Sequence, residues 1–397
     1  MKRNILFLLR TYNDIDHIAP VIWKAAKSGC GTFFLFVGED YSEDYRIRFL
    51  LDLGASRVRS STIEWYHASL RPMIAVSLLR KIVDRLVSYT VGVHLLKRWK
   101  TQVIVTEWCG PYGREKAIYY LQASGLLALP TYSLPHGYLI FTNPQFNRLL
   151  TKKYKSNREV PDFAERNWYT KYVVQSEEHK SLNIAWGMIN EKLVVLGSAR
   201  FCREWSEINQ RLLLGNEKTR SKSKRYRVIF FLPHWDYNVH REKCIKLLEM
   251  ISRLTDVYLE VKAHTRGSGS LTTEEINRVT LRGNASFINE GTHSTELVNR
   301  ADVVISFGSS VGFEALRQEK LMINPTYLHD NQTIFDETNV VIDASDEQSV
   351  VQAIVDHKLS QNHYIDRNLV QKFLQYRVDA GFGRREVLQD YVDLLCE

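Results

Sequence analysis

Strand-length apolar runs alternate with helix-length amphipathic segments along most of this chain of 397 residues. Short runs that are apolar throughout are typical of parallel strands buried on both faces and joined by crossover helices. In the first half the predicted strands are residues 5–9, 32–37, 103–106 and 171–174. The predicted helices are residues 19–27, 45–53 and 114–123, with most of residues 63–100 helical as well. The alternation therefore predicts an α/β protein.

A polar and strongly basic interval, residues 216–225 (NEKTRSKSKR), separates this series from a second one. The second series predicts strands at residues 228–232, 257–261, 286–288, 303–306 and 321–323. Its helices are expected at residues 241–254, 273–279, 294–299 and 311–318, and residues 368–395 are helical by period. We therefore expect two Rossmann-like α/β domains, residues 1–215 and 226–365, facing across a cleft, with C-terminal helices at residues 366–397 that pack back onto the first domain.

Composition narrows the class of protein. With 44% hydrophobic and 25% charged residues, and with apolar runs far shorter than the roughly 20 residues that span a bilayer, a soluble globular protein is expected. The apolar run after Lys2 and Arg3 ends at Arg10, which is too short for a secretory signal, so we expect a cytoplasmic protein. Five scattered cysteines form no C-x-x-C pair, which argues against a zinc site or a disulfide framework.

The formal net charge of +8 favours an anionic partner. Because no nucleic-acid-binding motif is present, we expect a phosphorylated substrate or an acidic membrane surface, and no nucleic acid. Residues 78–100 are apolar on one side and basic on the other. This segment predicts either peripheral contact with the inner membrane or a helix pair packed on the domain with its lysines outside.

The most informative passage is ADVVISFGSSVGFEALRQE, residues 301–319, in which a buried strand ends in a Gly-Ser-Ser turn and a helix begins at once. Backbone amides at a helix start, together with the hydroxyls of Ser309 and Ser310, suit a phosphate, although either serine alone would serve as a helix cap. His264 and Arg266 follow another strand and are able to pair with the same phosphate, unless they are solvated surface charges. Glu314 lies one helical turn beyond Ser310 and is placed to accept hydrogen bonds from a ribose, unless it is a surface residue that stabilises the helix.

Six short motifs occur in a recognisable order. They are LPHG (134–137), VLGSARF (195–201), FFLPHWD (230–236), VKAHTR (261–266), ADVVISFGSSVGFEAL (301–316) and INPTYLHDNQTIFDE (323–337). Across roughly residues 130–340 this pattern resembles the GT-B glycosyltransferases of bacterial surface polysaccharides, near the CDP-glycerol glycerophosphotransferase and capsule-synthesis group. The 301–316 block is the specific part of the match.

The resemblance implies roles for individual residues. His264 and Arg266 would meet the donor phosphates, Ser309 and Ser310 would hold them, and Glu314 or Thr333 would help to fix the nucleotide. Lys262 and His234, in the same motifs, join this donor-binding set, and His136 would act near the acceptor. The glycerophosphotransferases typically have Trp before His-Gly and Asp in place of Glu314, so a sugar is expected as cargo rather than glycerol phosphate.

Transfer to an acceptor hydroxyl needs a base, and the first domain offers several. The candidates are Asp14, Asp16, His17, Glu107 and His136. Glu107 ends a strand and opens a turn-rich loop, and a histidine such as His136 suits proton transfer near neutrality. Asp14-x-Asp16 matches a metal-binding D-x-D, but one such match is expected by chance. We therefore predict no metal, with His264, Arg266 and the helix start stabilising the leaving phosphate.

The sequence thus predicts a metal-independent glycosyltransferase of capsule or lipopolysaccharide synthesis that needs no cofactor. Its donor would be a nucleotide sugar, either a CMP-linked acid such as Kdo or sialic acid or a CDP- or UDP-linked sugar, and its acceptor a glycan or a lipid-linked molecule. Three alternatives stay open: a polyol-phosphate transferase of the teichoic-acid type, a UDP-sugar 2-epimerase, and a non-catalytic scaffold that binds a lipid-linked glycan.

Overall fold

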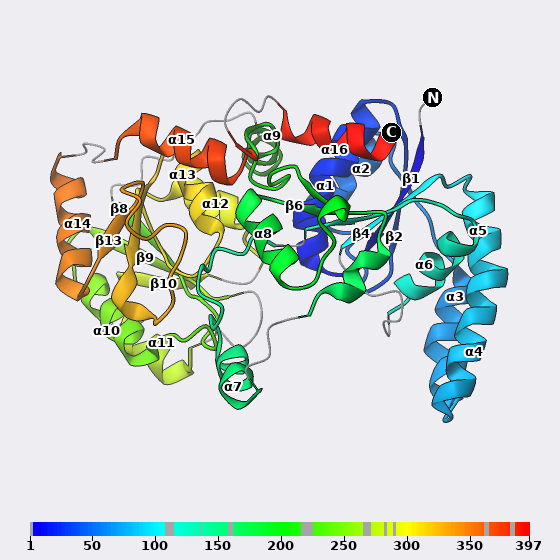
Figure 1. The fold of residues 1–397 in the computed structure, drawn as a ribbon. Helices are drawn as coiled ribbons and strands as arrows, with labels where there is room; N and C mark the ends of the chain where they lie inside the picture. Colours follow the sequence, from blue (N-terminus) through cyan, green and yellow to red (C-terminus); the bar gives the residue numbers. More distant parts are fainter. Residues whose placement is uncertain are drawn as a thin grey trace. The chain divides into compact units, whose positions relative to one another are not determined.

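The structure is a computed structural model that describes residues 3–107, 115–135, 137–157, 162–215, 225–264, 271–281, 284–288, 291–360, 365–381 and 386–397, with side chains omitted for 153–157. The chain forms two compact units (Figure 1). Unit 1 comprises Met1–Tyr138, Pro161–Trp205 and Tyr376–Glu397, and unit 2 comprises Leu139–Val160 and Ser206–Gln375. Each unit therefore combines segments that are distant in the sequence.

Unit 1 contains a sheet of parallel strands in the order β3-β2-β1-β4-β5-β6-β7. The strands are β1 (Asn4–Leu9), β2 (Gly31–Phe36), β3 (Ser56–Arg57), β4 (Val103–Glu107), β5 (Thr131–Leu134), β6 (Lys171–Val174) and β7 (Leu193–Val195). This order, in which the first strand lies at the centre and the chain continues first to one side and then to the other, is that of a Rossmann sheet. The four strands predicted for this half are confirmed to within one residue at each end.

Helices cover both faces of the unit 1 sheet because its central strands are apolar on both sides. Leu6 and Leu8 of β1 belong to the core under α5 (Val93–Arg98) and α6 (Ala117–Leu126). The intervening residues of β1 face the opposite layer, which holds α1 (Tyr12–Lys27), α2 (Tyr45–Asp52) and α16 (Val387–Cys396). Side chains that alternate in direction along one buried strand thus support two helical layers.

Two helical predictions for unit 1 need correction. Helix α1 begins at Tyr12 rather than at residue 19, because Thr11 and Asp14 form a capping box that starts the helix directly after β1. Residues 63–100 are not one regular helix: α3 (Ser61–Trp65), α4 (Ser77–Val87) and α5 are joined by the wider turns η1 (Tyr66–Leu70) and η3 (Ser88–Gly92) and by the short turn η2 (Arg71–Met73).

Unit 2 contains a second parallel sheet, in the order β10-β9-β8-β11-β12-β13. Its strands are β8 (Tyr226–Phe231), β9 (Val257–Lys262), β10 (Ala285–Ile288), β11 (Val303–Ser306), β12 (Leu321–Pro325) and β13 (Ile342–Ala344). One face carries α10 (Arg241–Ser252), α11 (Thr273–Thr280) and α14 (Glu347–Ser360), and the other carries α12 (Ser294–Arg300) and α13 (Val311–Arg317). This is the second Rossmann-like unit predicted from the sequence.

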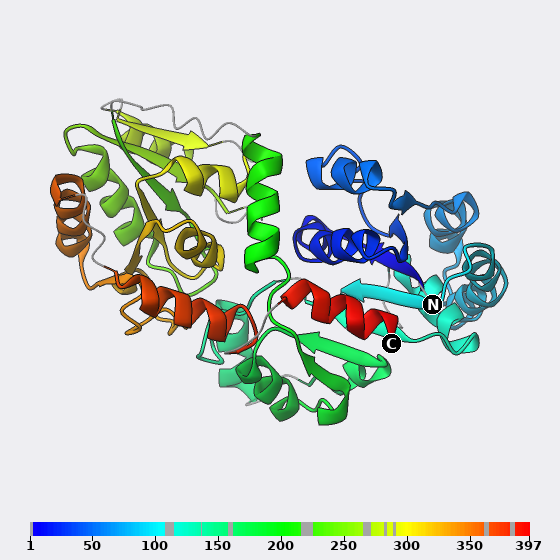
Figure 2. The same ribbon diagram turned by 90° about the horizontal axis from the view of Figure 1, so that it is seen from above.

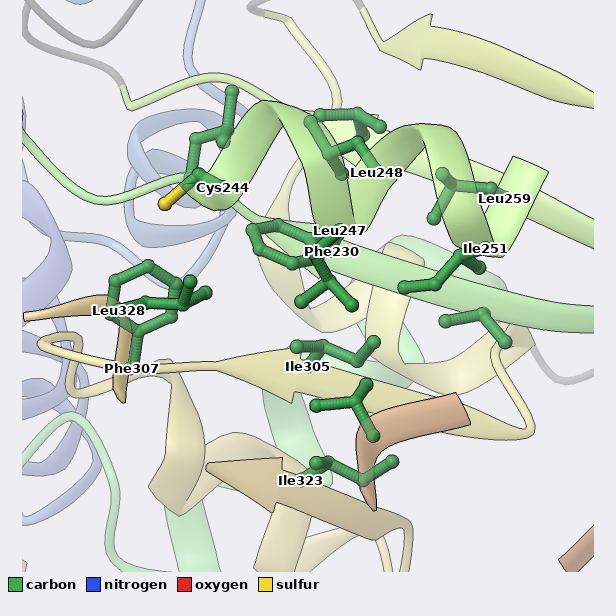
Figure 3. Close-up of a cluster of buried hydrophobic side chains, with 14 of the residues drawn as sticks. Phe230, Cys244, Leu247, Leu248, Ile251, Leu259, Ile305, Phe307, Ile323 and Leu328 are labelled. Carbon is green, nitrogen blue, oxygen red and sulfur yellow. The ribbon is translucent and has the colours of Figure 1, made fainter. Parts of the chain in front are cut away.

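The core beneath α10 is closely packed (Figure 3). Phe230, Ile305 and Ile323 come from three neighbouring strands and pack beneath Leu247 and Leu248 of the helix. The alternating residues of the same strands face α12 and α13, as parallel strands buried on both sides require.

The remaining helices are α7 (Arg148–Asn157), α8 (Glu177–Ala185), α9 (Arg203–Leu214) and α15 (Arg367–Arg377), with short turns at Ala164–Trp168, Asn190–Lys192 and Thr326–Leu328. Phe373 of α15 packs against Phe313 and Phe335 in unit 2. Helix α16 instead lies along α1 in unit 1 (Figure 2), where the hydroxyl of Tyr391 donates a 2.8 Å hydrogen bond to the carbonyl of Gly197. Within the described ranges, no helix is both long and apolar enough to cross a lipid bilayer.

The packing of unit 2 is tested at Ile305, a fully buried residue of the central strand β11. Ile305→Ala should lower the free energy of unfolding by about 3 kcal/mol, because it leaves a cavity in a close-packed core. The control, Leu281→Ala, alters a leucine that is 85% exposed and should change stability by less than about 0.5 kcal/mol. Urea denaturation measures the free energy of unfolding of both variants. Equal losses would contradict the placement of Ile305 in the core.

Candidate functional site

In unit 2 the chain leaves neighbouring strands β8 and β11 in opposite directions. From β8 it crosses to β9 on one side, and from β11 it crosses to β12 on the other. Loops that diverge in this way leave a crevice beyond the carboxyl ends of the two strands, which is where sheets of this kind bind ligands. His234 follows β8, and Ser309 and Ser310 follow β11, so these predicted donor-binding residues lie at the same edge of the sheet.

The basic residues predicted for the donor follow the adjacent strand. Lys262 is the last residue of β9, is buried, and is paired in register with Phe231 of β8. The ring of His264 lies 5.5 Å from that of His234, edge to face. The Nδ1 atom of His234 accepts a 3.2 Å hydrogen bond from the amide of Asp236, so in the neutral ring the proton is on Nε2. Arg266 lies outside the described residues.

A tight turn brings the chain from β11 into α13. Gly308 has a positive φ of 65°, and a Cβ at this position would lie 3.3 Å from the ring of Phe141. The hydroxyl of Ser309 accepts a 3.3 Å hydrogen bond from the amide of Val311, whereas the side chain of Ser310 makes no capping bond to the described backbone of α13. Helix α13 has only about two turns, so few aligned peptide dipoles contribute. Lys262 brings a positive charge to the same edge, and a contribution of the helix start to phosphate binding stays a prediction.

Glu314 and Thr333, the two predicted nucleotide contacts, are both buried and engaged within unit 2. Glu314 accepts a 3.3 Å hydrogen bond from the hydroxyl of Thr295 in α12. Thr333 donates a 2.6 Å hydrogen bond to Asp336 and accepts one of 3.2 Å from the amide of Phe335. These bonds hold the side chains of Glu314 and Thr333 in place within unit 2. Direct contact with a nucleotide stays a prediction for both residues.

Sequence reasoning missed His329, which stacks on Phe307 with parallel rings 5.5 Å apart, next to the Gly308 turn. Its Nδ1 atom accepts a 3.1 Å hydrogen bond from the amide of Asn331. Asn331 in turn receives side-chain hydrogen bonds from Asn143 and Asn238, so one buried amide ties three loops of unit 2 together. Burial lowers the pKa of His329. The motif INPTYLHDN contains this histidine, but nothing in the sequence pairs it with Phe307.

The lowered pKa of His329 predicts a pH dependence of stability. The unfolded chain, with a histidine pKa of about 6.5, takes up this proton before the folded protein does, so stability falls as the pH drops from 7 towards the pKa of the folded state. His329→Gln should therefore lose less stability than the wild type between pH 7 and pH 5.5, as measured by urea denaturation at each pH. Identical losses would show that His329 does not carry this dependence.

Unit 1 has its own switch point between β1 and β4, and charged residues gather there. Glu107, the last residue of β4, is buried and forms an ion pair with Arg10, the residue after β1. Arg10 also pairs with Glu115 at 2.8 Å, and its amide donates a 2.7 Å hydrogen bond to Asp14. Arg10 therefore contacts two of the predicted base candidates, Glu107 and Asp14. The sequence does not indicate this role, because it shows only a single arginine after a strand.

Asp14 and Asp16 do not act as a pair in this structure. Asp14 caps α1, accepting a 3.0 Å hydrogen bond from the hydroxyl of Thr11, whereas Asp16 forms ion pairs with Arg46 and, at 2.9 Å, with Arg200. Helix residues two apart point in different directions, which explains the separate partners. His17 is buried and packs edge to face on Phe201. Among the described residues, no three His, Cys, Asp or Glu side chains are grouped to hold a metal ion.

Unit 1 also contains an open cavity of about 340 Å³ near the ends of β2 and β3. Its lining residues are Phe36, Gly38, Asp40, Arg57, Arg59, Glu64, His67, Ala68 and Lys116. The Nδ1 atom of His67 lies 3.0 Å from the hydroxyl of Tyr119, which donates to Asp84 at 3.2 Å, so His67 contributes the Nδ1 proton and keeps Nε2 as an acceptor. Burial, Arg71 and Lys116 lower the pKa of His67. The neutral imidazole of His67 is a base candidate that the sequence did not indicate. His136, the histidine that the sequence did suggest as a base, lies outside the described residues.

Solved structures with the same two-sheet architecture include sugar-nucleotide enzymes. A UDP-GlcNAc 2-epimerase from Neisseria meningitidis bound to UDP-GlcNAc has a TM-score of 0.63 at 12% identity and covers 100% of this chain and 99% of its own. A glycosyltransferase from Rickettsia africae has a TM-score of 0.60 at 14% identity, covering 99% and 98%. Anabaena Alr3699/HepE in complex with UDP-glucose has a TM-score of 0.58 at 12% identity, covering 99% of each chain.

No family model matches the chain, and no curated protein matches it. The structural neighbours nevertheless share the whole architecture, so the chain has the GT-B fold, as the sequence predicted. At 12–14% identity the likeness establishes the fold alone, and the particular activity has to be argued from the site.

Proposed function

We propose that this protein is a glycosyltransferase that moves a sugar from a nucleotide-activated donor to a glycan or lipid-linked acceptor in bacterial capsule or lipopolysaccharide synthesis. The observation that carries the proposal is the convergence of Lys262, His264, His234 and the Gly308–Ser310 turn at the switch point of unit 2. A cation, two ring nitrogens able to donate and two hydroxyls are the groups that hold a phosphate. Unit 2 is thus the donor domain, and unit 1 supplies the acceptor site and the base.

The reaction in this proposal needs neither a metal nor a cofactor. Lys262, together with a protonated His264, would stabilise the charge that develops on the leaving phosphate, the role that a metal has in other transferases. The carboxylates of Asp14-x-Asp16, which would be the obvious metal ligands, are engaged with Thr11 and with two arginines. The donor is a UDP-, CDP- or CMP-linked sugar, and bound UDP-sugars in the structural neighbours favour UDP as the first nucleotide to test.

Nucleotide binding is tested by thermal shift with UDP, CDP and CMP. At a ligand concentration about 100 times Kd, one of them should stabilise the protein by about 2.7 kcal/mol. His264→Ala or Ser310→Ala should abolish the shift, because each removes a phosphate contact. The matched control His94→Ala alters an exposed histidine of unit 1 and should keep it. If no nucleotide raises the melting temperature, the donor site is wrong.

The base is tested by single replacements in unit 1: Glu107→Gln, His136→Ala and His67→Gln. The one that removes the base should lower kcat by about 10²- to 10⁴-fold while keeping the nucleotide shift. Glu107 must first part from Arg10 to accept a proton, whereas His67 needs no ion pair to open. If all three variants stay active, these assignments fail and Asp14→Asn and Asp16→Asn are tested next.

A UDP-sugar 2-epimerase is the second candidate, because full-length structural neighbours include several enzymes of that activity. The two reactions differ in what they require. An epimerase converts its nucleotide sugar without any acceptor, whereas a transferase releases the nucleotide only when an acceptor takes the sugar. NMR of UDP-GlcNAc incubated with the protein alone therefore separates the two reactions. If a second epimer of the nucleotide sugar appears, the protein is an epimerase and the transferase proposal fails.

A further inference from the structure

The exposed apolar side chains of the described residues are concentrated in one short segment. Nine of the eighteen large apolar side chains that are exposed lie between Trp65 and Tyr89, although this stretch is a small part of the chain. Met73 is 80% exposed and Leu78 69% exposed. Single exposed apolar residues are ordinary, but a contiguous group marks an interaction surface. We call the exposed apolar side chains of Trp65–Tyr89 the hairpin surface.

The hairpin surface is continuous along one helix. Leu78, Ile82 and Leu86 of α4 are spaced four residues apart, Leu79 lies beside them on the same helix, and Tyr89 follows in η3, so the five form an apolar stripe about 100° wide. Stripes of that width normally face a core. Here the core is met by the opposite side of α4, where Asp84 is buried and accepts hydrogen bonds from Tyr66 and Arg71. The outward stripe is therefore a second apolar face.

The hairpin surface is carried by a helical hairpin of unit 1, in which α3 with η1 forms one arm and α4 forms the other. Figure 1 shows α3 and α4 side by side, running to a shared tip, and the bonds from Tyr66 and Arg71 to Asp84 tie the two arms together. The hairpin surface differs from the amphipathic segment, residues 78–100, that the sequence suggested for membrane contact. Leu95 and Leu96 are buried, and Trp99 stacks on Tyr120 with ring centroids 6.0 Å apart, so the last part of that segment packs inward.

The charges beside the stripe identify the partner. Lys81 and Arg85 flank it on α4, are exposed, and form no ion pair with any carboxylate of the described residues. From residue 61 to residue 100 the chain has seven Lys and Arg but only two acidic residues. A second copy of the same surface would bring these cations together, which opposes self-association. Apolar side chains that alternate with cations suit the headgroup region of an anionic bilayer, where both kinds of group are satisfied.

We propose that the hairpin surface binds the surface of an anionic lipid bilayer, with the stripe on α4 and Met73 inserted among the headgroups and Lys81 and Arg85 on lipid phosphates. Turn η1, in the same hairpin, supplies His67 and Ala68 to the wall of the 340 Å³ cavity, which brings that cavity close to the lipid. Insofar as the proposed transferase function holds, its acceptor is then a lipid-linked molecule held at the membrane.

Vesicle sedimentation tests this without any nucleotide, so the result does not depend on the transferase activity. The full chain should sediment with vesicles of phosphatidylcholine and phosphatidylglycerol in a 1:1 ratio, and at least about tenfold more weakly with phosphatidylcholine alone or at high salt, which screens the cations. Absence of binding to the mixed vesicles would overturn the proposal.

Paired variants locate the surface. Leu78→Gln with Ile82→Gln should reduce binding to mixed vesicles at least about tenfold, and Lys81→Glu with Arg85→Glu should remove the preference for phosphatidylglycerol. The matched control, Leu281→Gln with Leu359→Gln, alters two leucines that are 85% and 78% exposed in unit 2 and should bind as the wild type does. Because all these side chains are exposed, melting temperatures should stay unchanged.

Two outcomes would contradict the assignment. If the Leu78→Gln and Ile82→Gln protein binds mixed vesicles as well as the wild type, another surface is responsible. If the wild type is a dimer by light scattering and that double variant is a monomer, the hairpin surface joins two copies of the chain instead.

Discussion

Parallel strands can be joined only by crossovers that pass over a face of the sheet, and this constraint governs both units. Every paired strand of the two sheets runs parallel, so helices must cover both faces and the loops at the carboxyl ends become the available place for chemistry. Reversal of the strand order opens one crevice per sheet. Lys262, His234 and Ser310 lie at one such edge, and Arg10 and Glu107 at the other, because the topology leaves these positions uncovered.

The same constraint explains which elements could be predicted from the sequence. Strands β1 and β11 are apolar on both faces and therefore stand out as runs, whereas β9 alternates apolar residues with Tyr258, Glu260 and Lys262. The residues after β9 and β11 follow predicted strands and lie at the same sheet edge. Strands β3 and β13 have two and three residues and lie at sheet edges, so they leave little pattern. Partners distant in the sequence were also invisible: nothing near Glu107 or Asp84 indicates that Arg10 or Tyr119 will meet it.

The two candidate edges differ in the kinds of charged residue that they bring together. In unit 1 the buried carboxylates already have basic partners, Glu107 with Arg10 and Asp16 with Arg46 and Arg200. A buried ion pair is costly to break, so these groups stabilise a fixed arrangement as much as they offer reactivity. In unit 2 the predicted donor-binding residues Lys262, His264 and His234 are basic, and Asp236 lies 3.6 Å from His234. The basic residues gathered at that edge support the proposal of an anionic ligand there, and the ion pairs of unit 1 direct the search for the base to neutral groups such as His67.

The division of the chain between the units affects how the protein emerges from the ribosome. The chain passes from one unit to the other four times, and the final stretch, Tyr376–Glu397, belongs to the unit that begins with the first strand. Helix α16 covers α1 there, so a nascent unit 1 keeps the apolar side of α1 uncovered until Val387–Cys396 has been made. Unit 2, by contrast, has all its segments earlier in the chain. Translation order thus favours completion of unit 2 before unit 1.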